Sequence, residues 1–165
     1  SRGLGDVYKR QFMNTAEKKE IMEAVFQAGL PIGSMSVSAL TKYALGDPDE
    51  EIRKKAMQIA EKSIELAVDL GVRTVMIPGY DIYFGESTIE TKKYFLENVK
   101  KIAEIAEREG ILVGFETMEN NFMNTTGKAV QYVNMVDSAY LKIYPDAGNI
   151  TNAAVENQHL SLIHI

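Results

Sequence analysis

Two carboxylate residues each follow closely on a short apolar run of the sequence. Glu116 comes directly after residues 112–115, and Asp146 comes after residues 141–144 and one proline. In an α/β barrel the working residues sit at the carboxyl ends of strands, because the loops there face a common mouth. Carboxylate oxygens that converge from different strands are the ligands that a hard divalent cation prefers. The pattern alone leaves open a metal site, a glycosidase-type carboxylate pair, and solvated charges or helix N-caps.

A second pair of polar residues follows another apolar run. Tyr80 and Asp81 come after residues 74–77 and a Pro-Gly pair, at the same kind of position as Glu116 and Asp146. We therefore consider Tyr80 and Asp81 candidate substrate contacts at the mouth. The alternative is that they only shape the loop between a strand and a helix.

Three segments that lie between these apolar runs carry apolar residues at helical spacing. Each begins with a capping residue and ends at a glycine, as helices commonly do. The predicted first residues and terminal glycines are Asn14 and Gly29, Asp47 and Gly71, and Ser87 and Gly110. The acidic residues Glu17 and Glu90 would complete capping boxes with Asn14 and Ser87. A fourth helix is predicted to begin at Asn124.

The apolar runs themselves predict buried parallel strands. They comprise residues 32–37, 74–77, 112–115 and 141–144. Nearly continuous Val, Ile and Leu between amphipathic helices is typical of a sheet covered by helices. A repeated α/β unit of ~35 residues fits a doubly wound sheet or a (β/α)8 barrel, and a barrel needs about 250 residues. The sequence would therefore supply about four βα units of a barrel.

Both ends of the chain are predicted to be foreign to the protein. Residues 1–11 match the translation of a transposon sequencing adapter, and the complementary strand of the codons for residues 6–11 encodes residues 160–165. Such processing scars are excluded from reasoning about the fold. We therefore expect residues 12–159 to be the natural segment, a fragment of one domain.

Composition excludes several classes of protein. The hydrophobic and charged fractions of 45% and 25% are those of a globular domain, and the net charge of -5 is opposite in sign to a typical nucleic-acid-binding surface. Cysteine is absent, which excludes thiolate metal ligands and favours a cytoplasmic location. No apolar run approaches the ~20 residues of a membrane span. A glycine-rich dinucleotide fingerprint is also absent from the sequence.

Several motifs together resemble the L-ribulose-5-phosphate 3-epimerase (L-xylulose-5-phosphate 3-epimerase) family. The strongest are Gly-Phe-Glu-Thr-Met-Glu-Asn-Asn-Phe-Met-Asn at residues 114–124 and Tyr-Pro-Asp-Ala-Gly-Asn at residues 144–149. Ser-Met-Ser-Val-Ser at residues 34–38 and Pro-Gly-Tyr-Asp-Ile-Tyr at residues 78–83 follow the same order and spacing. The likeness covers residues 12–159. One departure is the loop at residues 39–43, which lacks the histidine and arginine expected there.

This resemblance implies a xylose-isomerase-like (β/α)8 barrel with one divalent ion, of Mn, Zn, Mg or Co, held by Glu, Asp, His and Glu from four strands. Glu116 and Asp146 match the first two ligands, and the other two would lie beyond His159. Glu116 would also be one of two acid/base groups, whereas Asp146 would serve as ligand only. The implied reaction is the epimerisation of L-ribulose 5-phosphate to L-xylulose 5-phosphate, in pentose catabolism.

Other enzymes of the same fold are alternatives to this interpretation. A ketose 3-epimerase for unphosphorylated sugars, a hydroxypyruvate isomerase and an inosose dehydratase would share the carboxylates. An apurinic endonuclease on this fold is disfavoured by the acidic charge. The isolated chain is itself predicted to be an inactive, truncated product, and a homo-oligomer of the complete enzyme is compatible with the sequence. We expect neither a nucleic-acid nor a membrane partner.

Overall fold

A computed structural model describes residues 13–157 of the chain. The two segments assigned to an adapter, residues 1–11 and 160–165, lie outside the described residues, as does His159.

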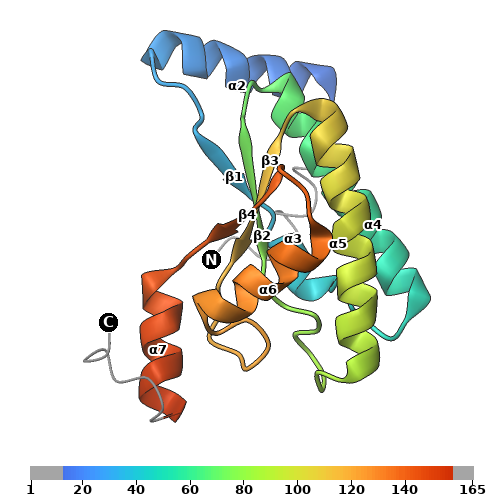
Figure 1. The fold of residues 1–165 in the computed structure, drawn as a ribbon. Helices are drawn as coiled ribbons and strands as arrows, with labels where there is room; N and C mark the ends of the chain where they lie inside the picture. Colours follow the sequence, from blue (N-terminus) through green and yellow to red (C-terminus); the bar gives the residue numbers. More distant parts are fainter. Residues whose placement is uncertain (1–12, 158–165) are drawn as a thin grey trace.

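Four parallel strands form one sheet at the centre of the molecule (Figure 1). The strands are β1 (Ser34–Ser36), β2 (Thr74–Pro78), β3 (Leu112–Glu116) and β4 (Leu141–Tyr144). They pair in the order β1-β2-β3-β4. All four predicted strands are confirmed, although β1 is shorter than the run of residues 32–37 from which it was predicted.

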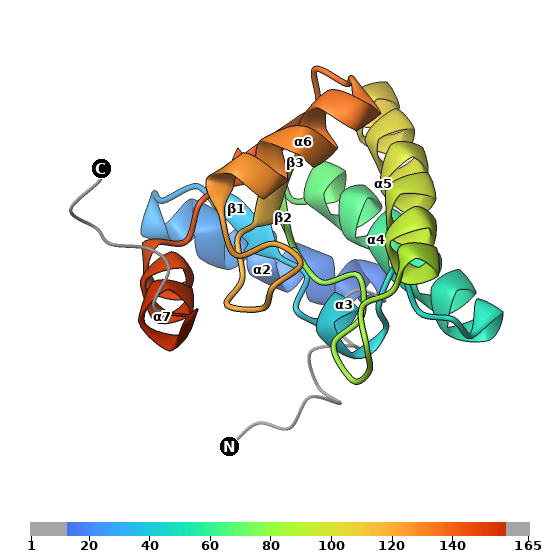
Figure 2. The same ribbon diagram turned by 60° about the horizontal axis from the view of Figure 1, so that its bottom comes forward.

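Helices connect the strands and follow β4. They are α2 (Thr15–Ala28), α3 (Ala39–Lys42), α4 (Glu50–Asp69), α5 (Ile89–Glu109), α6 (Thr126–Val136) and α7 (Ala147–Asn157). Figure 2 shows α4, α5 and α6 in an arc beside the strands, with α7 on the other side from α4 and α5. Within residues 13–157, every helix is too short or too polar to cross a membrane.

The strand order distinguishes between the two folds that the sequence left open. A doubly wound sheet reverses its strand order at a switch point, so that helices cover both faces. Here each strand pairs with the next one along the chain, without reversal. Because crossovers between parallel strands are right-handed, successive crossovers in one direction place their helices on the same face. The structure is therefore a sector of a (β/α) barrel.

The core lies between the sheet and the helices α4 and α5. Phe95 of α5 stacks on Phe115 of β3 at a ring-centroid distance of 5.7 Å and meets Phe122 edge to face at 5.0 Å. Buried residues recur at helical spacing along α4, at Ala56, Ile59, Ala60, Ser63, Ile64, Leu66 and Ala67. This amphipathic pattern holds both helices against the strands whose ends carry the candidate site.

Three predicted helix starts differ from those observed. The N-caps are Asp49, Thr88 and Thr125, one or two residues later than the predicted Asp47, Ser87 and Asn124. In each case the earlier residue is used elsewhere: the Asp47 carboxylate accepts from the amide of Asp49, the Ser87 hydroxyl donates to Asp81, and the Asn124 side chain accepts from Lys128. The predicted capping box of Asn14 and Glu17 is confirmed.

The first helix, α2, has an apolar stripe with little to pack against. No residue of α2 is buried, and the Phe26 side chain is 87% exposed. A cavity of about 240 Å³, lined largely by apolar side chains of α2, β1 and α4, separates these elements. The helical period of α2 was predicted correctly, and within its apolar stripe Ile21 packs against the core while Met22 and Phe26 are exposed.

Candidate metal and acid/base site

Glu116 is the last residue of β3, in the middle of the sheet. Its backbone pairs with Pro78 of β2 on one side and with Tyr144 of β4 on the other. The side chain is half-buried, and its carboxylate has no hydrogen-bond partner within residues 13–157. A partly buried carboxylate without a donor favours a positive ligand or a proton.

Gly79 allows β2 to approach this position closely. Its amide donates to the carbonyl oxygen of Glu116 at 3.1 Å. A Cβ atom at residue 79 would lie 2.4 Å from the same oxygen and 2.7 Å from Cγ of Met123. Any larger residue would therefore push apart the strand ends that carry the site.

The electrostatic environment of Glu116 raises the pKa of its carboxyl group. Burial is the main cause, followed by the negative charges of Asp146 and of Glu119. Asp146 and Glu119 therefore both lie near enough to Glu116 to disfavour the charged form of its carboxyl group. A carboxyl group whose pKa is raised toward neutrality is suited to accept and return a proton.

Asp146 lies at the start of α7 and caps this helix. Its Oδ1 accepts a hydrogen bond from the amide of Asn149 at 2.8 Å, and its carbonyl accepts from the amide of Ile150 at 3.1 Å. The N-cap interpretation of Asp146 is therefore confirmed. It does not exclude a ligand role, since Oδ2 has no hydrogen-bond partner in the described part of the chain.

Thr117 joins the loop after β3 to the loop after β4. The amide of Asp146 donates to Thr117 Oγ1 at 2.8 Å, and the Thr117 hydroxyl faces the carbonyl of Asp146 at 3.4 Å. The side-chain amide of Asn149 donates to the Thr117 carbonyl at 3.0 Å. The residue after Glu116 is thus bonded directly to Asp146 and to its helix.

Tyr80 reaches the same region from the end of β2. Its hydroxyl donates to Oε1 of Glu119 at 3.0 Å, and its side chain is buried. Burial, and then this hydrogen bond, raise the pKa of Tyr80, which keeps its proton. Glu119 did not stand out in the sequence as a candidate. Its position three residues after Glu116, in the same loop, was the only signal.

Asp81 is fully buried and bonds to the first turn of α5. Its Oδ2 accepts from the hydroxyls of Ser87 at 2.6 Å and Thr91 at 2.7 Å. Its Oδ1 is buried without a hydrogen-bond partner among the described residues. The structure thus gives Asp81 a role in holding the loop, and its contact with substrate stays a prediction, as does that of Tyr80.

Asp81→Ala is expected to lower the free energy of unfolding by about 1 to 3 kcal/mol, because the hydroxyls of Ser87 and Thr91 lose their shared acceptor. Urea denaturation followed by far-UV circular dichroism at low protein concentration measures this change. Glu86→Ala, in the exposed part of the same loop, is the matched control. Equal stability of the two variants would show that Asp81 does not hold the loop.

The donor set fits part of a site for a hard cation. Glu116 and Asp146 offer carboxylate oxygens from neighbouring strands, which is the chemistry that Mg²⁺ or Mn²⁺ prefers. Within residues 13–157, no three His, Cys, Asp or Glu side chains gather closely enough to hold a metal ion. Among the described residues, Glu116 and Asp146 are therefore a candidate pair of ligands and not a complete set.

Comparison with known proteins agrees with the fold. The family model described as "Xylose isomerase-like TIM barrel" matches residues 5–164. The L-ribulose-5-phosphate 3-epimerase UlaE of Shigella boydii serotype 18 is 30% identical over 135 residues, which are 82% of this chain and 48% of that protein. The chain spans about half the length of the curated relatives it matches.

Solved structures with the same fold include a D-psicose 3-epimerase in the presence of D-fructose, with a TM-score of 0.74 and 19% identity over 88% of this chain and 53% of that one. A xylose isomerase-like TIM barrel protein from Mycobacterium smegmatis in complex with magnesium has a TM-score of 0.67 and 20% identity, covering 85% of this chain and 49% of that one. At these identities the likeness supports the fold alone.

Proposed function

We propose that this chain, which belongs to the xylose isomerase-like TIM barrel family, is part of a metal-dependent sugar-phosphate 3-epimerase that interconverts L-ribulose 5-phosphate and L-xylulose 5-phosphate. The observation that carries the proposal is that Glu116 and Asp146 follow adjacent, paired strands and lie close enough for the charge of Asp146 to raise the pKa of Glu116. The likeness to L-ribulose-5-phosphate 3-epimerases supports the choice of substrate.

Epimerisation at C3 of a 2-ketose requires removal of the proton next to the carbonyl and its return to the opposite face. In this proposal the Glu116 carboxylate takes or returns the proton on one face, and Asp146 holds the cofactor from the neighbouring strand. A divalent ion, when bound, would supply Lewis-acid stabilisation of the charge that develops on the substrate oxygen atoms. The group on the other face would come from the rest of the barrel, outside residues 13–157.

The ion is expected to be a hard or borderline divalent metal, Mn, Zn, Mg or Co. A protein of the same fold, from M. smegmatis, has been solved in complex with magnesium. The complete barrel means residues 13–157 together with the strands that would close the barrel.

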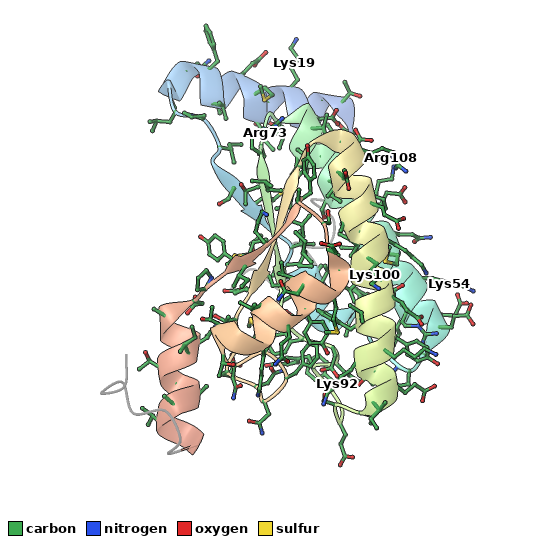
Figure 3. The ribbon with its side chains drawn as sticks, viewed as in Figure 1. Lys19, Lys54, Arg73, Lys92, Lys100 and Arg108 are labelled. Atoms are coloured by element: carbon green, nitrogen blue, oxygen red, sulfur yellow. The ribbon has the colours of Figure 1, made fainter. Side chains whose placement is uncertain are left out.

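The distribution of basic residues supports a sugar-phosphate enzyme rather than a DNA-repair enzyme of the same fold. Figure 3 labels Lys19, Lys54, Arg73, Lys92, Lys100 and Arg108, of which Lys54, Lys92, Lys100 and Arg108 lie on α4 and α5. The basic residues of these two helices are interspersed with Glu and Asp. Lys54 pairs with Glu50 and Glu51 on α4. A face that binds nucleic acid gathers its basic residues in one patch or stripe.

The substrate proposal predicts that the complete barrel epimerises L-ribulose 5-phosphate with a divalent ion and without nicotinamide. The measurement is deuterium incorporation at C3 in D₂O, with unphosphorylated L-ribulose as the parallel substrate and a chelator as the control. We expect exchange on the phosphorylated sugar that stops when the metal is removed. Equal rates on both sugars would instead support a ketose 3-epimerase for free sugars, and undiminished exchange with chelator would contradict metal dependence.

A further inference from the structure

We propose that Thr117, with Asn149, is a positioning residue that sets the spacing of the Glu116 and Asp146 carboxylates before a metal ion binds. The inference rests on the proposed metal-dependent function and concerns residues that do not contact the ion. Thr117 stands next to Glu116 in sequence and is fully buried.

Thr117 makes hydrogen bonds to three successive residues of the segment that runs from β4 into α7: Tyr144, Asp146 and Asn149. Its amide donates to the carbonyl of Tyr144 at 3.2 Å, which extends the β3-β4 ladder by one residue. Its hydroxyl oxygen accepts from the amide of Asp146 at 2.8 Å. Its carbonyl accepts from the side chain of Asn149 at 3.0 Å, in the first turn of α7. One residue thus connects a strand end, a ligand and a helix.

These bonds hold the Asp146 carboxylate directly and reach Glu116 only through the backbone of Thr117. Asn149 contacts Asp146 a second time, because its own amide donates to Oδ1 of that residue at 2.8 Å. The Asp146 side chain is thereby held on the helix side, while its backbone is held by Thr117. Glu116, in contrast, has no side-chain hydrogen bond in the described part of the chain, so its position follows from the backbone that Thr117 anchors.

Such a clamp favours metal binding because the two carboxylates repel each other. Like charges on neighbouring segments would separate if the loops were free, and the hydrogen bonds of Thr117 and Asn149 hold these segments together. Groups that orient metal ligands through hydrogen bonds typically change metal affinity by about 10- to 100-fold when mutated. If the Thr117 bonds only joined the two strand ends, their loss would lower the free energy of unfolding and leave the metal affinity unchanged.

The test compares Thr117→Val, which keeps the shape and removes the hydroxyl, with Thr117→Ser, which restores it. Thr91→Val is the matched control, because Thr91 is another buried threonine whose hydroxyl bonds to a carboxylate, that of Asp81. Mn²⁺ is titrated into the 165-residue chain and each variant, and binding is followed by water-proton relaxation. A second titration uses the larger Ca²⁺ in competition with Mn²⁺. Glu116→Gln removes one of the two proposed ligands and so measures the Mn²⁺ that binds elsewhere on the chain.

We expect Thr117→Val to weaken Mn²⁺ binding about tenfold, and Ca²⁺ binding by less, since Ca²⁺ tolerates more variable ligand spacing than a smaller ion. Thr117→Ser and Thr91→Val should bind Mn²⁺ as the unmodified chain does. Unchanged Mn²⁺ affinity in Thr117→Val would overturn the inference alone. Equal losses of Mn²⁺ and Ca²⁺ affinity in Thr117→Val, or a similar loss of Mn²⁺ affinity in Thr91→Val, would also overturn it. Either result would show that the substitution acts through a general effect on folding. Equal Mn²⁺ binding by the unmodified chain and Glu116→Gln would overturn the proposed metal site as well.

Discussion

Glu116→Gln in the complete barrel should reduce proton exchange at C3 by at least about 10²-fold, the lower bound of what a positioned acid/base group contributes. The amide has nearly the shape of the carboxylate but cannot accept the C3 proton. It also removes a negative charge from the pair formed with Asp146. The exchange of substrate deuterium with solvent, measured by NMR at saturating metal concentration, reports this step directly.

Asp146→Asn is the matched comparison for Glu116→Gln. Asp146 is proposed to bind the ion but not to move a proton, so excess metal should restore a large part of the activity of Asp146→Asn. The same excess should not restore Glu116→Gln. Exchange at the unmodified rate in Glu116→Gln would remove Glu116 from the mechanism, and equal rescue of the two variants would show that both residues act only as ligands.

The sequence was sufficient to find the two carboxylates for a physical reason. Parallel strands covered by helices are nearly continuous apolar runs, so their carboxyl ends are visible as the point where a charge first appears. That rule located Glu116 and Asp146 at the ends of β3 and β4. Thr117 and Glu119 could not be found in this way, because their partners, Asp146 and Tyr80, are distant in sequence.

The predicted helix starts show the limit of local signals. Ser87 and Asn124 are good capping residues in isolation, but each has a polar partner, Asp81 and Lys128 respectively, that the fold provides. A threonine one residue later then takes the cap position. The helices α3 and α7 were not predicted. The four residues of α3 are too few to show a period. The start of α7 lies in Asp-Ala-Gly-Asn at residues 146–149, a sequence that is also typical of a turn.

The chain of 165 residues on its own is expected to lack epimerase activity. In the proposed mechanism, residues 13–157 supply two carboxylate ligands and one acid/base group, and no third His, Cys, Asp or Glu side chain of that range gathers with them. Without a group on the opposite face of the planar intermediate, the proton can be removed and returned only on one side. An assay with L-ribulose 5-phosphate and Mn²⁺ tests this, and appreciable turnover would show that the site is complete within the chain.

The same chain should bind a hydrophobic dye, because apolar surface lacks partners. Both β1 and β4 are edge strands within the described sheet, and open parallel edges favour association. On α2, the Phe26 side chain is 87% exposed, and a cavity of about 240 Å³ lies between α2, β1 and α4. Phe26→Ser should lower dye fluorescence and aggregation measured by light scattering. Ile89→Ser is the matched control, since Ile89 is 90% exposed at the start of α5, away from that cavity. If the two substitutions lowered dye binding equally, exposure of any large apolar side chain would explain the signal, and the open side of the sheet at α2 and β1 would not be its source.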